Sequence, residues 1–260
     1  MVVETWPVHC MLRRSEVHWS LVREVKAEIL DNQFMHAPNP IADKFVAARR
    51  AMVQDQIRKR GVLSPRVLEA MLLVPRHEFV PAEFRGEAYA DKPLPIGEGQ
   101  TISQPYVVAA MTEALELSGS DRVLEIGTGS GYHAAVLSLL AREVISVEYQ
   151  KSLALSAQER LMDLGYPNIR VHFGDGSLGF PVAAPYDAIL VTAAASEIPG
   201  TLANQLREGG RLVIPVGTHG SQHLVQARKE DGNLKSRVLF DCQFVPLLGR
   251  YGWSRDDVRR

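Results

Sequence analysis

The sequence predicts an α/β fold: a doubly wound, mostly parallel sheet, with helices before it and an antiparallel hairpin after it. Three observations predict this class. Short apolar runs alternate with helical patterns between residues 119 and 216, as in parallel sheets whose strands are joined by helices. A glycine-rich turn follows the first of these runs. Two strand patterns near the C-terminus flank Asp231-Gly232, which is typical of a hairpin turn.

Composition narrows the class of protein. The chain has 260 residues, enough for one large core, and its 46% hydrophobic and 23% charged content excludes a disordered or collagen-like chain. A net charge of −1 disfavours a nucleic-acid partner. Two cysteines, Cys10 and Cys242, exclude a disulfide scaffold. No apolar run reaches the roughly 18–20 residues of a membrane span, and no secretory signal pattern is present, so we expect a cytoplasmic protein without a membrane partner.

The first 40 residues are predicted to be an N-terminal extension, partly helical, to a single domain spanning residues 41–260. In residues 15–30 an apolar residue recurs every fourth position, which indicates an amphipathic helix. We expect this helix to pack on its own domain or on a partner subunit, with a membrane surface as the alternative. Residues 36–40 are interpreted as a linker. The apolar positions are Val17, Leu21, Val25 and Ile29.

The elements between this extension and the sheet are predicted from caps and helix stops. A helix is expected over residues 44–60, with Asp43 as its N-cap and Gly61 as its stop. Ser64-Pro65 is typical of the start of another helix. Residues 75–104, rich in proline and glycine, are predicted to be ordered loop, and Ser103 is a candidate N-cap for the helix that follows.

The remaining elements follow from periodicity. Strands are expected over residues 122–126, 143–148, 169–173, 186–192 and 211–216, with an alanine- and leucine-rich helix after the glycine turn and further helices over 152–164 and 201–206. The hairpin is expected to pair residues 222–228 with residues 234–244.

The glycine turn and an acidic residue after it indicate a nucleotide-like ligand. Glycines in the run Gly127-Thr128-Gly129-Ser130-Gly131 let the backbone turn sharply and let a ligand lie against bare main chain. Glu148 ends the next predicted strand, where an acid binds a ribose diol in nucleotide-binding sheets. The third glycine comes one residue too early for the G-x-G-x-x-G pattern of dinucleotide sites, which opposes a nicotinamide oxidoreductase.

The G-x-G-x-G form, following Glu125-Ile126, resembles the first motif of S-adenosylmethionine-dependent methyltransferases, which have a Rossmann-like fold. Further matches follow in the same order along the chain. Gly174-Asp175-Gly176 corresponds to the segment that places an acceptor near the adenine amino group. Residues 185–189 and 206–212 match the fourth strand and the turn into the fifth.

Three other segments make the resemblance more specific. Residues 74–81 (VPRHEFVP), 99–105 (GQTISQP) and 244–249 (FVPLLG) resemble the protein-L-isoaspartate O-methyltransferase family, and the likeness covers roughly residues 44–250. It implies transfer of a methyl group from S-adenosyl-L-methionine to the free α-carboxylate of L-isoaspartyl residues in damaged proteins and peptides. The resulting ester recloses to a succinimide, and repeated cycles return the damaged site to aspartate.

The resemblance also implies a set of site residues. It implies a catalytic role for Ser103, no metal, and substrate contacts from Ile102, Ser103, Val245 and Pro246. The pair His219 and His223, which has half the pattern of a metal site, is instead interpreted as surface loop. The implied cofactor contacts come from Glu125, Gly127, Thr128, Gly129, Ser130, Gly131, Glu148, Asp175 and Gly176.

The residues present suit this chemistry. A carboxylate nucleophile with a pKa near 3.5–4 is ionised at neutral pH, so no general base is needed. The Ser103 hydroxyl can bind one carboxylate oxygen and leave the other aimed at the methyl group. A lysine or arginine in its place would hold the carboxylate too strongly in the ground state. The competing interpretation makes Ser103 a helix cap alone.

Two functional alternatives share the glycine loop. One is an S-adenosylmethionine-dependent methyltransferase that acts on a different small-molecule or RNA acceptor. Such an enzyme would have no reason to carry the sequences found at residues 101–105 and 245–247. The other is a non-catalytic module that binds an adenosine ligand. An assay of labelled methyl transfer to two peptides, which differ only in having isoaspartate or aspartate at one position, discriminates among these functions.

Overall fold

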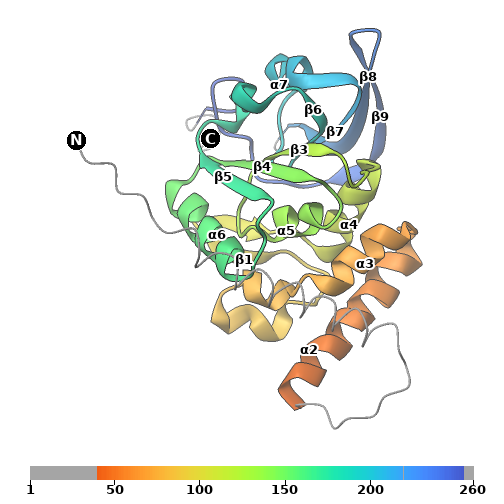
Figure 1. Cartoon of the computed structure of the whole chain (residues 1–260), viewed down its shortest axis with the longest axis vertical. Helices are drawn as coiled ribbons and strands as arrows, with labels where there is room; N and C mark the ends of the chain where they lie inside the picture. The colour runs from red at the N-terminus through yellow and green to blue at the C-terminus, as the bar shows by residue number, and fades with distance from the viewer. Residues whose placement is uncertain (1–39, 219, 255–260) are drawn as a thin grey trace, which may run out of the picture.

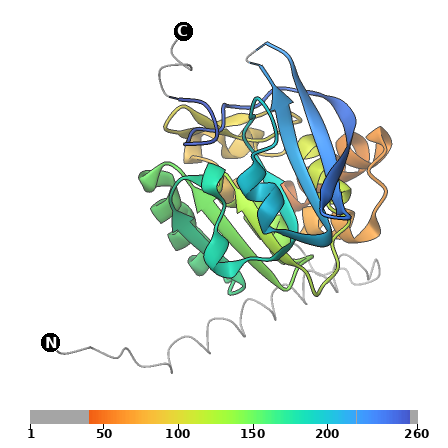
Figure 2. The ribbon, with the colours of Figure 1, turned by 90° about the horizontal axis from the view of Figure 1, so that it is seen from above.

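The computed structural model describes residues 40–218 and 220–254, with side chains from Phe45 onward. The helix predicted over residues 15–30, most of the predicted linker, Cys10 and His219 lie outside these residues. Figure 1 shows a central sheet, with helices α2 and α3 at one end of the molecule and the β8–β9 hairpin at the other. Figure 2 shows helices on both sides of that sheet.

The sheet has seven strands in the order β5-β4-β3-β6-β7-β8-β9, and this confirms the predicted class. The first five strands in this order, β5, β4, β3, β6 and β7, pair in parallel. Strand β8 pairs antiparallel with β7, and β9 pairs antiparallel with β8. Because the chain runs outward in both directions from the β3–β6 pair, the carboxyl ends of these two strands form a crevice where α/β sheets bind ligands. The strands are β3 (Arg122–Ile126), β4 (Glu143–Glu148), β5 (Ile169–Phe173), β6 (Tyr186–Val191), β7 (Leu206–Gly217), β8 (Gln222–Glu230) and β9 (Asn233–Cys242).

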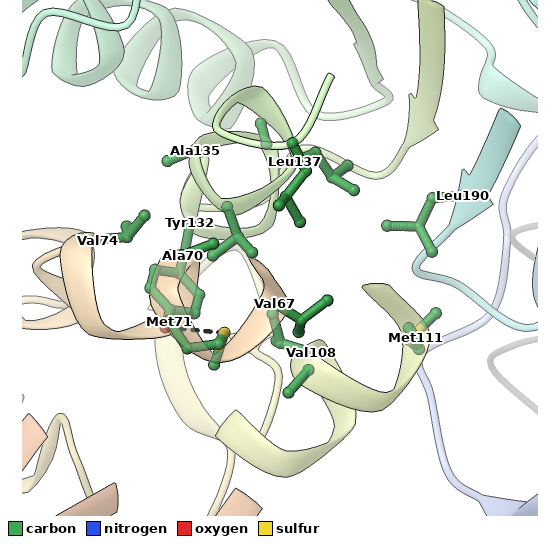
Figure 3. Packing of buried hydrophobic residues seen from close by; sticks show 14 of the residues in the cluster. Val67, Ala70, Met71, Val74, Val108, Met111, Tyr132, Ala135, Leu137 and Leu190 are labelled. Carbon is green, nitrogen blue, oxygen red and sulfur yellow. Dashed lines mark hydrogen bonds between the residues drawn. The ribbon is translucent and has the colours of Figure 1, made fainter. Parts of the chain in front are cut away.

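Apolar side chains fill both faces of the sheet, because successive strand residues point to opposite sides. Val144 packs in the core beneath α3, α4 and α5, and the next residue, Ile145, packs in the second core on the other face. Figure 3 shows the first core, where the Tyr132 hydroxyl lies 3.8 Å from Met71 Sδ. The helices of the domain are α3 (Pro65–Leu73), α4 (Pro105–Ala114), α5 (Tyr132–Ser138), α6 (Lys151–Asp163) and α7 (Gly200–Gln205).

The first described helix differs from the prediction at its start. Helix α2 (Pro40–Ala51) begins before Asp43, so Asp43 is a helical residue and the predicted N-cap is wrong. Proline fits the first turn of a helix, because the backbone N–H groups of that turn have no acceptor within the helix and the N–H that proline lacks is not needed there. The helix continues as the π-helical segment η2 (Met52–Ile57) and the 3-10 segment η3 (Arg58–Arg60). It ends at Gly61, with φ of 98°, as predicted.

Residues 75–104 contain more regular structure than the predicted loop. They hold two 3-10 helices, η4 (Arg76–Phe79) and η5 (Ala82–Glu87), and the two antiparallel strands β1 (Leu94–Gly97) and β2 (Gln100–Ile102). Elements this short lack a detectable hydrophobic period, which is why composition indicated only loop. The small β1–β2 sheet carries the chain directly to Ser103.

The C-terminal hairpin has the predicted turn. Asp231 and Gly232 have φ of 52° and 76°, the left-handed pair that a two-residue hairpin turn requires. Among the described residues, no helix is both long and apolar enough to cross a membrane.

Candidate active site

A cavity opens at the carboxyl ends of β3 and β4, in the crevice described above. The glycine loop, the end of β4, the β2–α4 junction and the C-terminal segment line it. We call it the cofactor cavity. The sequence-predicted residues that line it are Ile102, Ser103, Gly127, Thr128, Gly129, Ser130, Glu148, Gly176, Val245 and Pro246.

The glycine loop is shaped at both ends by positions that exclude a side chain. Gly127 has φ of 95°, and a Cβ there would overlap Oγ1 of Thr192, which donates a hydrogen bond to the Gly127 carbonyl at 2.7 Å. Gly131, with φ of 89°, is the N-cap of α5, and its Cβ would lie 3.2 Å from Leu161. Gly127 lines the cavity, so bare backbone faces a ligand there, which is what close approach of a ligand needs.

Glu148 holds the loop and faces the cavity at the same time. Its Oε2 accepts a hydrogen bond from the Gly129 amide at 2.9 Å, and its Oε1 accepts one from the Gln150 amide at 2.8 Å. A carboxylate has about four acceptor positions, so two remain for ligand hydroxyls. The structure therefore gives Glu148 a loop-fixing role that the sequence did not predict.

Glu125 does not line the cavity, although the sequence predicts a cofactor contact for it. Its carboxyl is fully buried, with Oε2 2.5 Å from Ser146 Oγ, which lies 2.5 Å from Thr128 Oγ1 in the glycine loop. Oε1 has no hydrogen-bond partner among the described residues. Burial, together with the nearby Glu148 charge, raises the pKa of Glu125 to about 8, so the neutral form prevails at pH 7. A direct cofactor contact stays a prediction.

Asp175 and Gly131 also lie outside the cavity lining. The Asp175 carboxylate accepts hydrogen bonds from the Ser177 amide at 2.9 Å and from the Arg250 amide at 2.8 Å. Gly249 packs so closely that a Cβ there would overlap Asp175 Oδ1. Asp175 thus fastens the C-terminal segment beside the cavity, and its predicted role near adenine stays a prediction.

Ser103 is not a helix cap. The N-cap of α4 is Gln104, and Pro105 occupies the first helical position. The residue before a proline is extended, so the helix boundary falls one residue after Ser103. The Ser103 hydroxyl has no hydrogen-bond partner among the described residues, and it is free to bind a ligand.

A second cavity adjoins the first, and we call it the acceptor cavity after the substrate contacts that the sequence resemblance implies for Ser103 and Val245 in its lining. Residues from η3, the start of α4 and the end of β9 line it. The sequence did not single out its Arg60, Tyr106 or Phe240, because no local pattern connects residues so far apart in the chain. Ser103 lines both cavities and stands at their junction. The residues shared by the two linings are Thr101, Ser103, Thr192 and Val245.

Histidine and clusters of metal-ligating residues are scarce in the described lining. His133 is the one histidine that lines either cavity among these residues, and burial lowers its pKa to about 3. Its Nε2 lies 2.9 Å from Thr112 Oγ1 in the core. Within the described ranges, no group of three or more His, Cys, Asp or Glu residues could hold a metal ion. His223 lies 2.6 Å from Asp241, on the exposed surface.

A switch-point crevice, a glycine loop of bare backbone and a strand-end carboxylate place this protein in the class of α/β proteins that bind a nucleotide-like ligand at the edge of the sheet. Comparison with known protein families identifies the family within this class. Residues 47–252 match the model of the protein-L-isoaspartate(D-aspartate) O-methyltransferase (PCMT) family, and the chain belongs to this family.

Individual relatives agree with the family match. A Geobacter metallireducens protein-L-isoaspartate O-methyltransferase is 54% identical over 214 residues, 82% of this chain and 99% of that protein. A Methanoculleus marisnigri enzyme of the same name is 54% identical over 213 residues, 82% of this chain and 97% of its own. A Plasmodium falciparum structure described as a protein-L-isoaspartate O-methyltransferase, in complex with S-adenosyl-L-homocysteine, has a TM-score of 0.67 and 26% identity, covering 77% of this chain and 98% of its own.

Proposed function

We propose that this chain transfers a methyl group from S-adenosyl-L-methionine to the free α-carboxylate of L-isoaspartyl residues in proteins and peptides. The observation that carries the proposal is the position of Ser103, whose unpaired hydroxyl stands where the cofactor cavity meets the acceptor cavity. Damaged proteins and peptides are the proposed partners. Neither nucleic acid nor a membrane is required, and the cytoplasm remains the proposed compartment on the sequence argument.

The cofactor cavity fits S-adenosyl-L-methionine. Gly127 and Gly129 would lie against it, and Glu148 has free acceptor positions for its ribose hydroxyls. The bound cofactor would supply an activated methyl group on a sulfonium centre. The remaining requirements are orientation of the acceptor and exclusion of water, and these fall to the protein.

The residues at the junction can meet these requirements. The Ser103 hydroxyl would donate to one oxygen of the acceptor carboxylate and leave the other oxygen directed toward the cofactor cavity. Ile102 is buried and Val245 half-buried beside it, so apolar surface limits access of water. Orienting two reactants contributes roughly 7–11 kcal/mol in well-ordered intramolecular models. No proton has to be removed from an ionised carboxylate, which agrees with the poor basicity of His133.

The acceptor chemistry explains how such a transfer repairs protein. An isoaspartyl residue carries its chain through the side-chain carboxyl, and its α-carboxylate is free. Esterification turns the carboxylate into a methyl ester, whose carbonyl carbon is attacked by the neighbouring amide nitrogen with loss of methanol. Hydrolysis of the resulting succinimide gives aspartate in part. A small-molecule or RNA acceptor, the alternative use of the same cofactor site, is not favoured by the family match.

Labelled methyl transfer to three matched peptides tests the proposal. The peptides share one sequence and differ at one position: isoaspartate, aspartate, or isoaspartate with its α-carboxylate converted to an amide. We expect label in the first peptide alone. Equal labelling of the aspartyl peptide, or labelling of the amide, would overturn the proposed acceptor.

A further inference from the structure

The acceptor cavity contains an arginine that the proposed chemistry ought to avoid. Arg60 is the one lysine or arginine that lines either cavity among the described residues. A free guanidinium beside the acceptor carboxylate would bind it more strongly in the ground state than during transfer, because the carboxylate loses its negative charge as the ester forms. Such ground-state binding lowers the concentration of acceptor needed but slows the reaction of the bound complex.

Arg60 is held by two partners. Its Nη1 donates to Asp91 Oδ2 at 2.6 Å, and its guanidinium carbon lies 3.5 Å from the centroid of the Tyr106 ring. The Arg60 side chain is 45% exposed, and that of Asp91 is 25% exposed. Arg60 lines the cavity and Asp91 pairs with it from outside the lining, and solvent only partly screens their charges.

Asp91 does more than pair with Arg60. Its Oδ2 also accepts a hydrogen bond from Gln104 Nε2 at 2.7 Å, and its Oδ1 accepts a longer one from the Tyr106 amide at 3.4 Å. Gln104 directly follows Ser103. One carboxylate thus ties η3 to the first residues of α4, immediately after the residue at the junction. Asp91 itself does not line the cavity, so it faces no acceptor.

We propose that Asp91 is a positioning residue that neutralises Arg60 and holds it against Tyr106, so that the acceptor carboxylate is bound by Ser103 and not by the guanidinium. This inference rests on the proposed function, since it takes an isoaspartyl carboxylate as the acceptor. It accounts for how a cation can line the cavity of an enzyme that must keep its anionic nucleophile loosely bound. It also predicts an unusual outcome, in which removing a charge makes acceptor binding tighter and transfer slower.

Asp91→Asn separates charge from hydrogen bonding. Both short hydrogen bonds end on Oδ2, so an amide oxygen in that position keeps them, and the change removes the negative charge together with the longer bond from the Tyr106 amide to Oδ1. We expect the isoaspartyl peptide to bind about 3–10-fold more tightly to enzyme saturated with S-adenosyl-L-homocysteine, measured by calorimetry. We expect the single-turnover transfer rate with S-adenosyl-L-methionine to fall about 10-fold.

A double variant distinguishes this role from a structural one. Arg60→Gln with Asp91→Asn replaces a neutral ion pair by a neutral amide pair, so peptide affinity and rate should both return to within about 3-fold of wild type. Asp55→Asn is the matched control, because Asp55 pairs with Lys59 at 2.7 Å on the exposed side of the neighbouring segment and lines neither cavity. It should change neither value.

Several outcomes would overturn the inference. Weaker peptide binding by Asp91→Asn, unchanged affinity and rate, or a double variant that fails to recover would each do so. Cofactor affinity, measured in parallel, reports whether each variant is folded. A wild-type enzyme that labels no isoaspartyl peptide would overturn the proposed function, whereas normal wild-type labelling with unchanged affinity in Asp91→Asn would overturn this inference alone.

Discussion

The cofactor cavity and the acceptor cavity are built in different ways. The polar wall of the first comes from strand ends, where the buried Glu148 lines the cavity and accepts hydrogen bonds from backbone amides. Glu125 is buried behind this wall and bonded to the Ser146 hydroxyl. The second joins η3, α4 and β9, and its Arg60 side chain is 45% exposed and its Asp241 side chain 88% exposed. The comparison indicates that neighbouring strand ends fix the polar wall of the cofactor cavity, whereas the acceptor cavity depends on the packing of segments that are distant in the chain.

The largest expected effect concerns the buried carboxyl on the cofactor side. The pKa of Glu125 is raised from 4.5 to about 8, so the folded protein holds a proton that the unfolded chain releases above pH 4.5. The stabilisation is therefore complete below pH 4.5 and is lost as pH rises through about 8. One such proton changes the free energy of unfolding by up to about 1.4 kcal/mol per pH unit.

Urea denaturation at pH 5, 6.5 and 8 measures this effect as the difference between wild type and Glu125→Gln. Taking the difference cancels the contributions of other titratable groups to the pH dependence of stability. His133 is one of them, and its lowered pKa makes stability rise with pH, the opposite of the effect of Glu125. Glu197→Gln, at an exposed position, is the control and should follow the wild type. Identical pH dependence in Glu125→Gln and wild type would show that Glu125 is ionised in the folded protein.

Gly127→Ala tests the rigidity of the cofactor side. The new Cβ would overlap Thr192 Oγ1 at a φ of 95°, so the loop must shift, and we expect cofactor affinity to fall by about 2–4 kcal/mol. Calorimetric titration with S-adenosyl-L-homocysteine measures it. Gly232→Ala has a similar φ of 76° but open space around the new Cβ, and it should leave the affinity unchanged. Equal effects of the two changes would assign the loss to backbone strain alone.

Glu148→Ala should have a somewhat smaller effect on the same titration. Removing the carboxylate takes away the proposed ribose contact and the hydrogen bond to the Gly129 amide, and we expect a loss of about 1.5–3 kcal/mol. Peptide affinity should change little, since Glu148 does not line the acceptor cavity. Unchanged cofactor affinity would contradict the proposed ribose contact.

Truncation at Pro40 should have the smallest effect. The family match begins at residue 47, and the cavity linings described here begin at Arg60. A chain that starts near Pro40 should keep methyl transfer within about 2-fold of the full chain. A truncated protein that binds cofactor normally but fails to transfer methyl would place a necessary residue in the extension.

The two cavities also differ in how far the sequence predicts them. The glycine loop, Glu148 and the strands around them follow from spacing, since a parallel sheet places successive strand ends at one edge. Spacing does not reveal that Glu125 contacts the loop through Ser146, because burial and side-chain direction are properties of the folded core.

On the acceptor side, the family resemblance implies substrate contacts from Ser103 and Val245, whereas Arg60 and Tyr106 have no signal in the sequence. Their role depends on a carboxylate at Asp91 that is distant from Arg60 in the chain. Contacts of this kind arise only when η3 and α4 pack together. The N-cap at Gln104, one residue later than predicted, has a local cause in the proline that follows it.

Single-turnover methyl transfer by Ser103→Ala, followed from pH 5 to 8 beside the wild type, tests the central claim most directly. With saturating cofactor and isoaspartyl peptide, we predict a rate about 10–100-fold below wild type, equivalent to about 1.4–2.8 kcal/mol, with cofactor affinity unchanged. The wild-type rate should be flat from pH 6 to 8, because the nucleophile is already ionised. A fully active Ser103→Ala enzyme, or a wild-type inflection near pH 6.5, would contradict this account.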